Sequence, residues 1–119
     1  MSHIFHIAKE SVWRQARKTG AYTVDSLRSE GFIHCSEPQQ VIETANRLFR
    51  SHTGLVLLRI EIGKLRAMVR YENLEGGFEL FPHIYGELNI DAVSSVSSFE
   101  PSSSGAFDHH GQVIERGTP

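Results

Sequence analysis

Leu55-Val56-Leu57-Leu58-Arg59-Ile60-Glu61-Ile62 is the most apolar stretch of this chain, and the rest of the molecule must pack around it. Successive side chains of a β-strand point to opposite faces, so the even-numbered residues Val56, Leu58, Ile60 and Ile62 share one face. Leu57, Arg59 and Glu61 share the other face. The stretch therefore predicts a β-strand with one wholly apolar face, which needs a core to cover it.

The residues before this strand mix strand and helix signals. Aromatic and β-branched residues predict a short strand at 3–8, and helical spacing of apolar residues predicts a helix at 9–18. Thr23 is placed to cap a second, short helix that stops at Gly31, a residue suited to a helix C-terminus. Residues 32–35 form the next predicted strand.

The helix that follows has the clearest pattern in the chain. Ser36 and Gln39 stand three residues apart, which is the spacing of a capping box at a helix N-terminus. The apolar residues after them fall on one helical face: Val41, Ile42, Ala45, Leu48 and Phe49. We expect an amphipathic helix capped by Ser36.

Strands dominate the second half of the chain. The pattern predicts strands at 68–74, 78–80, 84–88 and 92–99, and Pro82 separates the second of these from the third. Helices gather in the first half and strands in the second, which favours an α+β fold over a doubly wound parallel sheet. We expect a single domain with a mixed or antiparallel sheet and two to three helices.

Length and composition fit one soluble domain. The chain has 119 residues, and 12 Lys+Arg against 14 Asp+Glu give a net charge of −2, which gives no indication of a nucleic-acid partner. We find no apolar run near the roughly 20 residues of a membrane span and no signal-peptide pattern, so we expect a cytoplasmic protein. The single cysteine excludes an internal disulfide. We expect the domain at 1–100 and a mobile or loosely docked polar tail at 101–119.

Histidine is the unusual component, with seven in this small chain. His6, His34 and His83 lie inside short apolar strands, where an unpaired imidazole would cost free energy. The other four are expected at the surface: His3, His52, His109 and His110. Three histidines in core-like segments indicate a shared polar cleft.

Strand alternation gives these histidines polar neighbours. His34 shares a face with Ser36, and His83 shares a face with Tyr85. Arg70 and Glu72 likewise lie on one face of their strand. The cleft would therefore contain hydroxyl, carboxyl and imidazole groups.

The same residues also have purely structural interpretations. A single histidine in a strand is often a hydrogen-bonded core residue. Arg70 and Glu72 fit a same-face ion pair, and Tyr22 and Tyr85 fit packing residues with a hydroxyl at the rim. Cys35 fits a small buried hydrophobe better than a nucleophile.

Motifs for other chemistries are absent or weak. The chain has no Walker loop, no Gly-x-Gly-x-x-Gly after a strand and no Gly-x-Ser-x-Gly elbow. A metal-dependent hydrolase built on His6, His34, His83 and Glu72 is a third alternative. No histidine pair has the close spacing typical of zinc ligands, so we expect no metal.

Several blocks of the sequence resemble a known family. They are Ile4-Phe5-His6-Ile7, Trp13, Gly20-Ala21-Tyr22, the block from Ser26 to Ser36 and Phe81-Pro82-His83-Ile84-Tyr85-Gly86. Together they resemble the uncharacterised bacterial proteins of domain-of-unknown-function family 952, over about residues 3–95. The block Ser-Leu-x-x-Glu-Gly-Phe-Ile-His-Cys-Ser is the most specific part.

That family is suggested to be distantly related to the ADP-ribosyltransferases, which implies a bent or split sheet with a cleft that binds NAD. The resemblance implies that His6 on the first strand donates to the nicotinamide ribose and that His34, with Ser36, takes the second position. His34 or Tyr22 would orient the nicotinamide ring. The helix N-terminus after Ser36 would attract a phosphate.

The third catalytic position of that superfamily is often a glutamate, and here it falls to His83, Tyr85 or Glu72. The resemblance thus implies an enzyme that cleaves the glycosidic bond of NAD, a small nucleotide ligand, or transfers its ADP-ribose. The alternative is a small binding or regulatory domain that returns its ligand unchanged.

Overall fold

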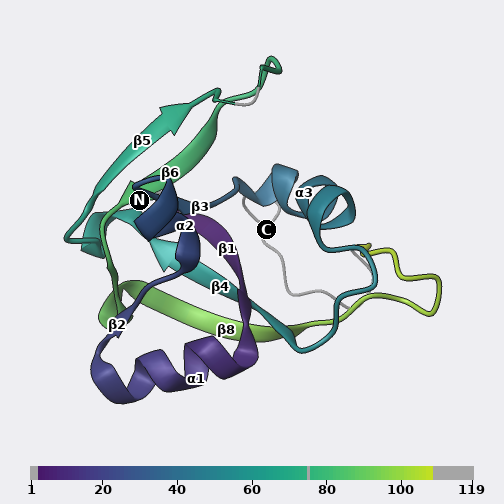
Figure 1. The fold of residues 1–119 in the computed structure, drawn as a ribbon, viewed down its shortest axis with the longest axis horizontal. Helices are drawn as coiled ribbons and strands as arrows, with labels where there is room; N and C mark the ends of the chain where they lie inside the picture. The colour runs from purple at the N-terminus through teal and green to yellow at the C-terminus, as the bar shows by residue number, and fades with distance from the viewer. Residues whose placement is uncertain (1–2, 75, 109–119) are drawn as a thin grey trace.

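The computed structural model describes residues 3–74 and 76–108 (Figure 1). The chain begins with β1 (His3–Lys9), α1 (Glu10–Thr19), β2 (Ala21–Tyr22), α2 (Asp25–Ser29) and β3 (Ile33–His34). A short 3-10 turn, η1 (Pro38–Gln40), leads into α3 (Val41–Leu48) and then β4 (Leu55–Glu61). The second half contains η2 (Ile62–Lys64), β5 (Met68–Glu72), β6 (Phe81–Tyr85), β7 (Leu88–Asn89), η3 (Ile90–Ala92) and β8 (Val93–Phe99).

The strands form three small sheets instead of one. Their orders are β1-β4-β8, β2-β7 and β3-β6-β5, and every strand pair within the described ranges is antiparallel. The predicted single-domain α+β fold, with a split antiparallel sheet and two to three helices, is confirmed. None of the helices in the described part of the chain is long and apolar enough to cross a membrane.

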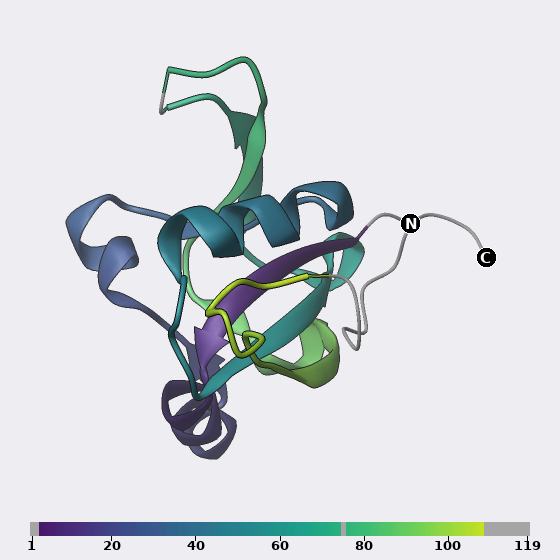
Figure 2. The ribbon, with the colours of Figure 1, turned by 90° about the vertical axis from the view of Figure 1, so that its right-hand side faces the viewer.

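β4 is the central strand of the first sheet, and both of its faces are buried. Leu58 and its even-numbered neighbours enter a first core that contains Trp13 of α1. Leu57, on the opposite face, joins a second core with Val41 of α3. Figure 2 shows α3 lying across this second face of the sheet. The most apolar stretch of the sequence therefore connects two cores.

The entry to α3 differs by one residue from its prediction. The capping box forms at Glu37, whose side chain accepts the backbone N–H of Gln40, while Gln40 Oε1 accepts the Glu37 N–H at 2.9 Å. Pro38 follows the cap, where its fixed φ suits the first helical position. The predicted cap at Ser36 is therefore wrong, because the proline sets the helix start one residue later.

The start of α2 also differs from the start expected from the sequence. Its N-cap is Val24, which makes no side-chain cap hydrogen bond, so the predicted cap at Thr23 is wrong.

Pro82 lies inside a strand, although the sequence predicts a break there. β6 runs through Pro82 as the middle strand of β3-β6-β5. The Pro82 carbonyl accepts the Cys35 N–H at 3.0 Å, but proline has no N–H to donate in return. The β3 ladder ends at this point, and the next residue, Ser36, exchanges two backbone hydrogen bonds of 2.8 Å with Phe5 of β1. This bridge joins the first sheet to the third.

The polar C-terminal segment docks through one aromatic residue. Phe107 is 2% exposed and stacks on Phe99 of β8, with ring centroids 4.8 Å apart. The Asn46 side chain of α3 donates to the Phe107 carbonyl at 2.9 Å and accepts its N–H at 2.7 Å. The core thus extends beyond the boundary expected at residue 100. Residues 109–119 of the expected tail, with His109 and His110, lie outside the described residues.

Candidate functional site

A cavity of about 380 Å³ lies where β1, β2, β3, β6 and α3 meet. His6, His34 and His83 all line it, together with Tyr22 and Ser36. The structure therefore brings these five residues, which were singled out from the sequence, to one place. The other two, Glu72 and Tyr85, lie behind His83 and reach the cavity through it.

His6 is held through both nitrogen atoms of its ring. Nδ1 lies 2.6 Å from the carbonyl oxygen of His34, and Nε2 lies 2.8 Å from the hydroxyl oxygen of Tyr22. A carbonyl can only accept, so Nδ1 carries the proton and the Tyr22 hydroxyl donates to Nε2. Burial lowers the pKa of His6 to about 4 and raises the pKa of Tyr22. Both groups are therefore neutral at pH 7.

This arrangement changes the role expected for His6. Its one N–H is used by the His34 carbonyl, so in this geometry His6 has no N–H left to donate to a ribose hydroxyl. The Tyr22 oxygen keeps acceptor capacity after donating to His6. Tyr22 is the member of the pair that is suited to receive a ligand N–H or O–H.

His34 pairs with a carboxylate near the end of α2. Its Nε2 lies 3.0 Å from Glu30 Oε1, and both side chains are about half exposed. An ion pair this exposed adds little stability. The carboxylate instead fixes the proton on Nε2, which leaves Nδ1 as an acceptor.

His83, which is buried, forms a second histidine–carboxylate pair. Its Nδ1 lies 2.8 Å from Glu72 Oε1, and the same oxygen accepts the Tyr85 hydroxyl at 2.6 Å. The hydrogen bonds from Tyr85 and from His83 lower the pKa of Glu72, and the bond to Glu72 raises the pKa of Tyr85. The ionised carboxylate fixes the proton of His83 on Nδ1 and leaves Nε2 as the basic nitrogen. Arg70 stands opposite His83, on the neighbouring strand β5.

Phe32 connects the two histidine–carboxylate pairs, and sequence reasoning did not single it out. Its ring stacks on His83 at 4.1 Å between centroids and meets the edge of His34 at 4.8 Å. The His34 and His83 rings are 5.5 Å apart. Phe32 shares the strand face of His34, and that alternation was the available signal.

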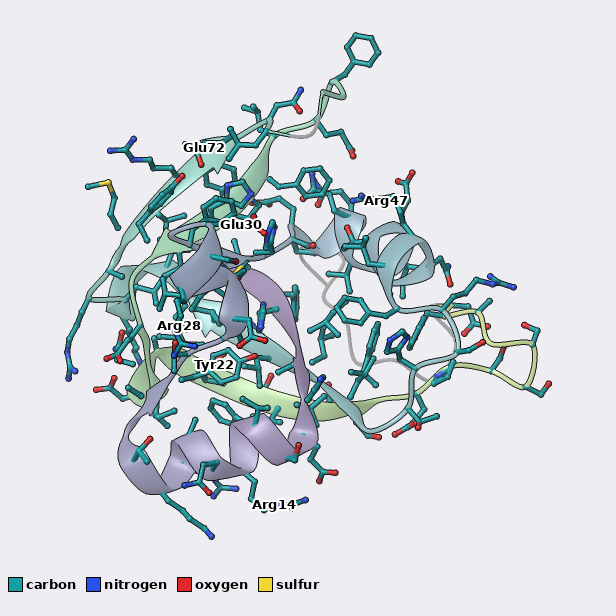
Figure 3. All side chains as sticks on the ribbon, in the orientation of Figure 1. Arg14, Tyr22, Arg28, Glu30, Arg47 and Glu72 are labelled. Atoms are coloured by element: carbon teal, nitrogen blue, oxygen red, sulfur yellow. The ribbon has the colours of Figure 1, made fainter. Side chains whose placement is uncertain are left out.

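Ser36 does not prepare a phosphate site as expected. Its hydroxyl is 3.5 Å from Thr44 Oγ1, and the helix N-terminus that follows is already capped by the Glu37 carboxylate. The positive charges in the cavity lining come from Lys9 and Arg47 instead. Figure 3 shows Arg47 on the α3 side, well apart from Tyr22.

The cysteine and the candidate metal ligands are the other groups with potential for chemistry. Cys35 is buried, and burial raises the pKa of its thiol, so it is not a reactive thiolate. Within residues 3–74 and 76–108, no group of three or more His, Cys, Asp or Glu side chains is placed to hold a metal ion.

Solved structures and a family model match most of the chain. The family model described as "Protein of unknown function (DUF952)" matches residues 7–96. The crystal structure of protein CC0527 from Caulobacter crescentus is similar with a TM-score of 0.81 at 30% identity, covering 90% of this chain and 94% of that chain. Its solution NMR structure gives a TM-score of 0.79 at 30% identity, covering 91% and 93%. No protein with a curated description matches. The chain belongs to the DUF952 family of proteins of unknown function.

Proposed function

We propose that the protein is an enzyme that binds a nucleotide such as NAD in this cavity and cleaves its nicotinamide glycosidic bond, passing ADP-ribose to water or another acceptor. The observation that supports this most is the convergence of His6, His34 and His83 with Tyr22 on one cavity. Small-molecule sites typically measure roughly 300–1,000 Å³, and the volume of about 380 Å³ falls within that range. The suggested distant relation of the family to ADP-ribosyltransferases makes NAD the first ligand to test.

The reaction needs a base near the reacting sugar. The bond between C1′ and the pyridinium nitrogen breaks with its electron pair passing to that nitrogen, so nicotinamide leaves neutral. Water forms the new bond to C1′ and gives up a proton. His83 Nε2 is suited to accept it, because Glu72 holds the Nδ1 proton and stabilises the resulting imidazolium. A positioned base of this kind contributes roughly 10²–10⁴-fold in rate.

The remaining lining residues suit binding. The Tyr22 oxygen can accept a hydrogen bond from an amide or hydroxyl of the ligand. Lys9 and Arg47 supply positive charge for phosphate groups. His34, held by Glu30 at the more exposed end of the site, can contact the ring or the acceptor. Glu72 and Tyr85 act as positioning residues through His83.

Release of nicotinamide from NAD, followed by chromatography, tests this proposal. We expect slow release by the wild type and a loss of at least about 100-fold in His83→Gln, the scale of a lost general base. Calorimetry should show that His83→Gln still binds NAD. His52→Gln is the matched control, because His52 is exposed, does not line the cavity and has its Nδ1 3.2 Å from the Arg50 carbonyl. No heat with either NAD or ADP-ribose at millimolar concentration would refute nucleotide binding.

One observation favours the alternative of a binding domain without chemistry. His6 and Tyr22 are neutral and hydrogen-bonded to each other, so two of the four residues that support the proposal already have structural roles. This alternative expects the ligand to be recovered unchanged after long incubation. Nicotinamide release that disappears in His83→Gln decides for the enzyme, whereas binding without any release decides for the binding domain.

A further inference from the structure

The hairpin formed by β5 and β6 carries most of the exposed apolar surface. Seven large hydrophobic side chains are exposed in the described part of the chain, and five of them lie between residues 68 and 80: Met68, Tyr71, Leu74, Phe78 and Leu80. Figures 1 and 2 show this hairpin projecting from the body, with β5 on the outside. Met68 and Tyr71 point to opposite faces of β5, so exposed apolar side chains flank this strand on both faces. Exposed apolar side chains gathered on one element of a soluble protein mark an interface.

β5 is also an edge strand. In the order β3-β6-β5 it pairs with β6 on one side only. The outer side of an edge strand presents unpaired N–H and C=O groups, which form a template for another strand. Proline and lysine commonly block such edges, and residues 68–73 contain neither.

The pairing of β6 decides which groups of β5 face outward. Pro82 directs its carbonyl toward β3, where it accepts the Cys35 N–H. Backbone groups alternate along a strand, so His83 directs its groups toward β5. Its partner there is Arg70, whose own groups therefore face β6. The next residue, Tyr71, directs its N–H and C=O outward.

We propose that the protein forms a symmetric dimer in which β5 of one copy pairs antiparallel with β5 of a second copy, centred on Tyr71. A two-fold axis at this residue sets Tyr71 against the partner's Tyr71, and their outward backbone groups exchange two hydrogen bonds. The same axis sets Arg70 opposite the partner's Glu72, and Glu72 opposite the partner's Arg70. Met68 then lies opposite the partner's Leu74, so charge meets opposite charge and apolar meets apolar.

Neighbouring registers are less favourable. Outward-facing residues must lie opposite outward-facing residues, and a two-fold axis can pass through either a hydrogen-bonded or a non-hydrogen-bonded pair. The nearest symmetric alternatives therefore place the axis at Arg70 or at Glu72, and the next ones at an odd-numbered residue further along. A shift of one pairing step toward Met68 sets Arg70 against the partner's Arg70, and a shift the other way sets Glu72 against the partner's Glu72. Like charges directly opposite destabilise an antiparallel pair, and opposite charges stabilise it. Of these registers, only the one centred on Tyr71 sets Arg70 against Glu72, so the charge pattern favours it.

The proposed interface also touches the candidate site. Glu72 is the carboxylate that holds His83 and Tyr85. In the dimer it would receive the partner's Arg70 guanidinium on the same face of the sheet. The dimer would join the two β3-β6-β5 sheets into one, with a cavity on each side. This inference does not depend on the proposed function, because it rests on the edge strand, its charge pattern and the exposed apolar side chains of the hairpin.

The first test is sedimentation equilibrium of the full chain from micromolar to millimolar concentration. The mass should rise from the monomer value of 13.4 kDa toward twice that value. Arg70→Glu and Glu72→Arg each place like charges opposite one another in a homodimer, so each should raise the dimer Kd at least about tenfold. An equimolar mixture of the two variants restores both opposite-charge pairs and should recover the dimer.

The control for a general effect of charge is Arg14→Glu. Arg14 is exposed on α1, far from Glu72 in Figure 3, and should leave the Kd unchanged. Glu72→Arg also removes a partner of His83, so circular dichroism must show that this variant is folded before its mass is interpreted.

A cysteine cross-link tests the register without altering Glu72. Residues opposite each other in a hydrogen-bonded antiparallel pair have Cα atoms about 5.5 Å apart, within the disulfide range of about 4.4–6.8 Å. Tyr71→Cys should therefore form a covalent dimer under mild oxidation. Met68→Cys, which is at least as exposed but lies away from the axis, should not. The native Cys35 is buried and does not interfere.

Three results would overturn the proposal. One is a wild-type chain that stays at 13.4 kDa up to millimolar concentration. Another is a dimer whose Kd is unchanged by Arg70→Glu or is not recovered in the mixture. The third is cross-linking of Met68→Cys as readily as Tyr71→Cys.

Discussion

His6 shows at the level of one residue what a sequence pattern can and cannot indicate. The pattern places it correctly inside an apolar strand, and the structure confirms that it is buried. The pattern does not reveal that Tyr22, which comes from a separate strand, donates a hydrogen bond to one ring nitrogen of His6. It also does not reveal the His34 carbonyl at the other nitrogen. These partners depend on long-range strand pairing, which local periodicity does not encode.

The lowered pKa of His6 should make stability depend on pH. The folded value is about 4 against an ordinary value of 6.5, so between them the unfolded chain binds more protons than the folded one. Stability is therefore lost as pH falls from 6.5 to 4, by about 3 kcal/mol for the full shift. Urea unfolding across this window should show a smaller pH slope in His6→Gln than in the wild type. Equal slopes would show that His6 is not the group responsible.

Among the elements, the docking of the C-terminal segment on α3 and β8 offers a direct stability test. Phe107→Ala leaves a cavity beside Phe99 and should lower the free energy of unfolding by about 3–5 kcal/mol. Phe78→Ala is the matched control, because that ring is fully exposed and its loss should change stability by less than about 0.5 kcal/mol. Urea unfolding at micromolar concentration measures both. Similar values for the two variants would mean that the segment does not contribute to the core.

Local patterns predicted elements well where one face is strongly periodic, as in α3 and β4. They failed for β6, because proline is normally excluded from a central strand. Pro82 is tolerated because its missing N–H falls where the β3 ladder ends. They also failed for Phe107, a single aromatic residue in a polar segment whose contacts with Asn46 and Phe99 come from elsewhere in the chain. For the site, the sequence pattern indicated the three histidines but missed two residues that orient them. Glu30 binds the His34 ring, and Phe32 contacts the rings of His34 and His83.

For the whole molecule, β4 makes the two cores interdependent. Leu58 packs in the first core and Leu57 in the second, so one core cannot open without disturbing the strand that supports the other. Trp13 is the only tryptophan and reports on the first core, whereas Phe107 belongs to the second. Phe107→Ala should therefore shift the unfolding midpoints of Trp13 fluorescence and far-UV circular dichroism equally. A fluorescence midpoint that does not move would show that the cores unfold separately.

The bridge between Phe5 and Ser36 has a consequence for any molecule that enters the cavity. It is the isolated bridge that joins the first sheet to the third, and both of its residues line the cavity. A molecule that contacts His6 of β1 and His83 of β6 links the first sheet to the third across this bridge. Its binding free energy then opposes separation of the two sheets. A ligand with higher affinity should therefore hold the first and third sheets together more firmly.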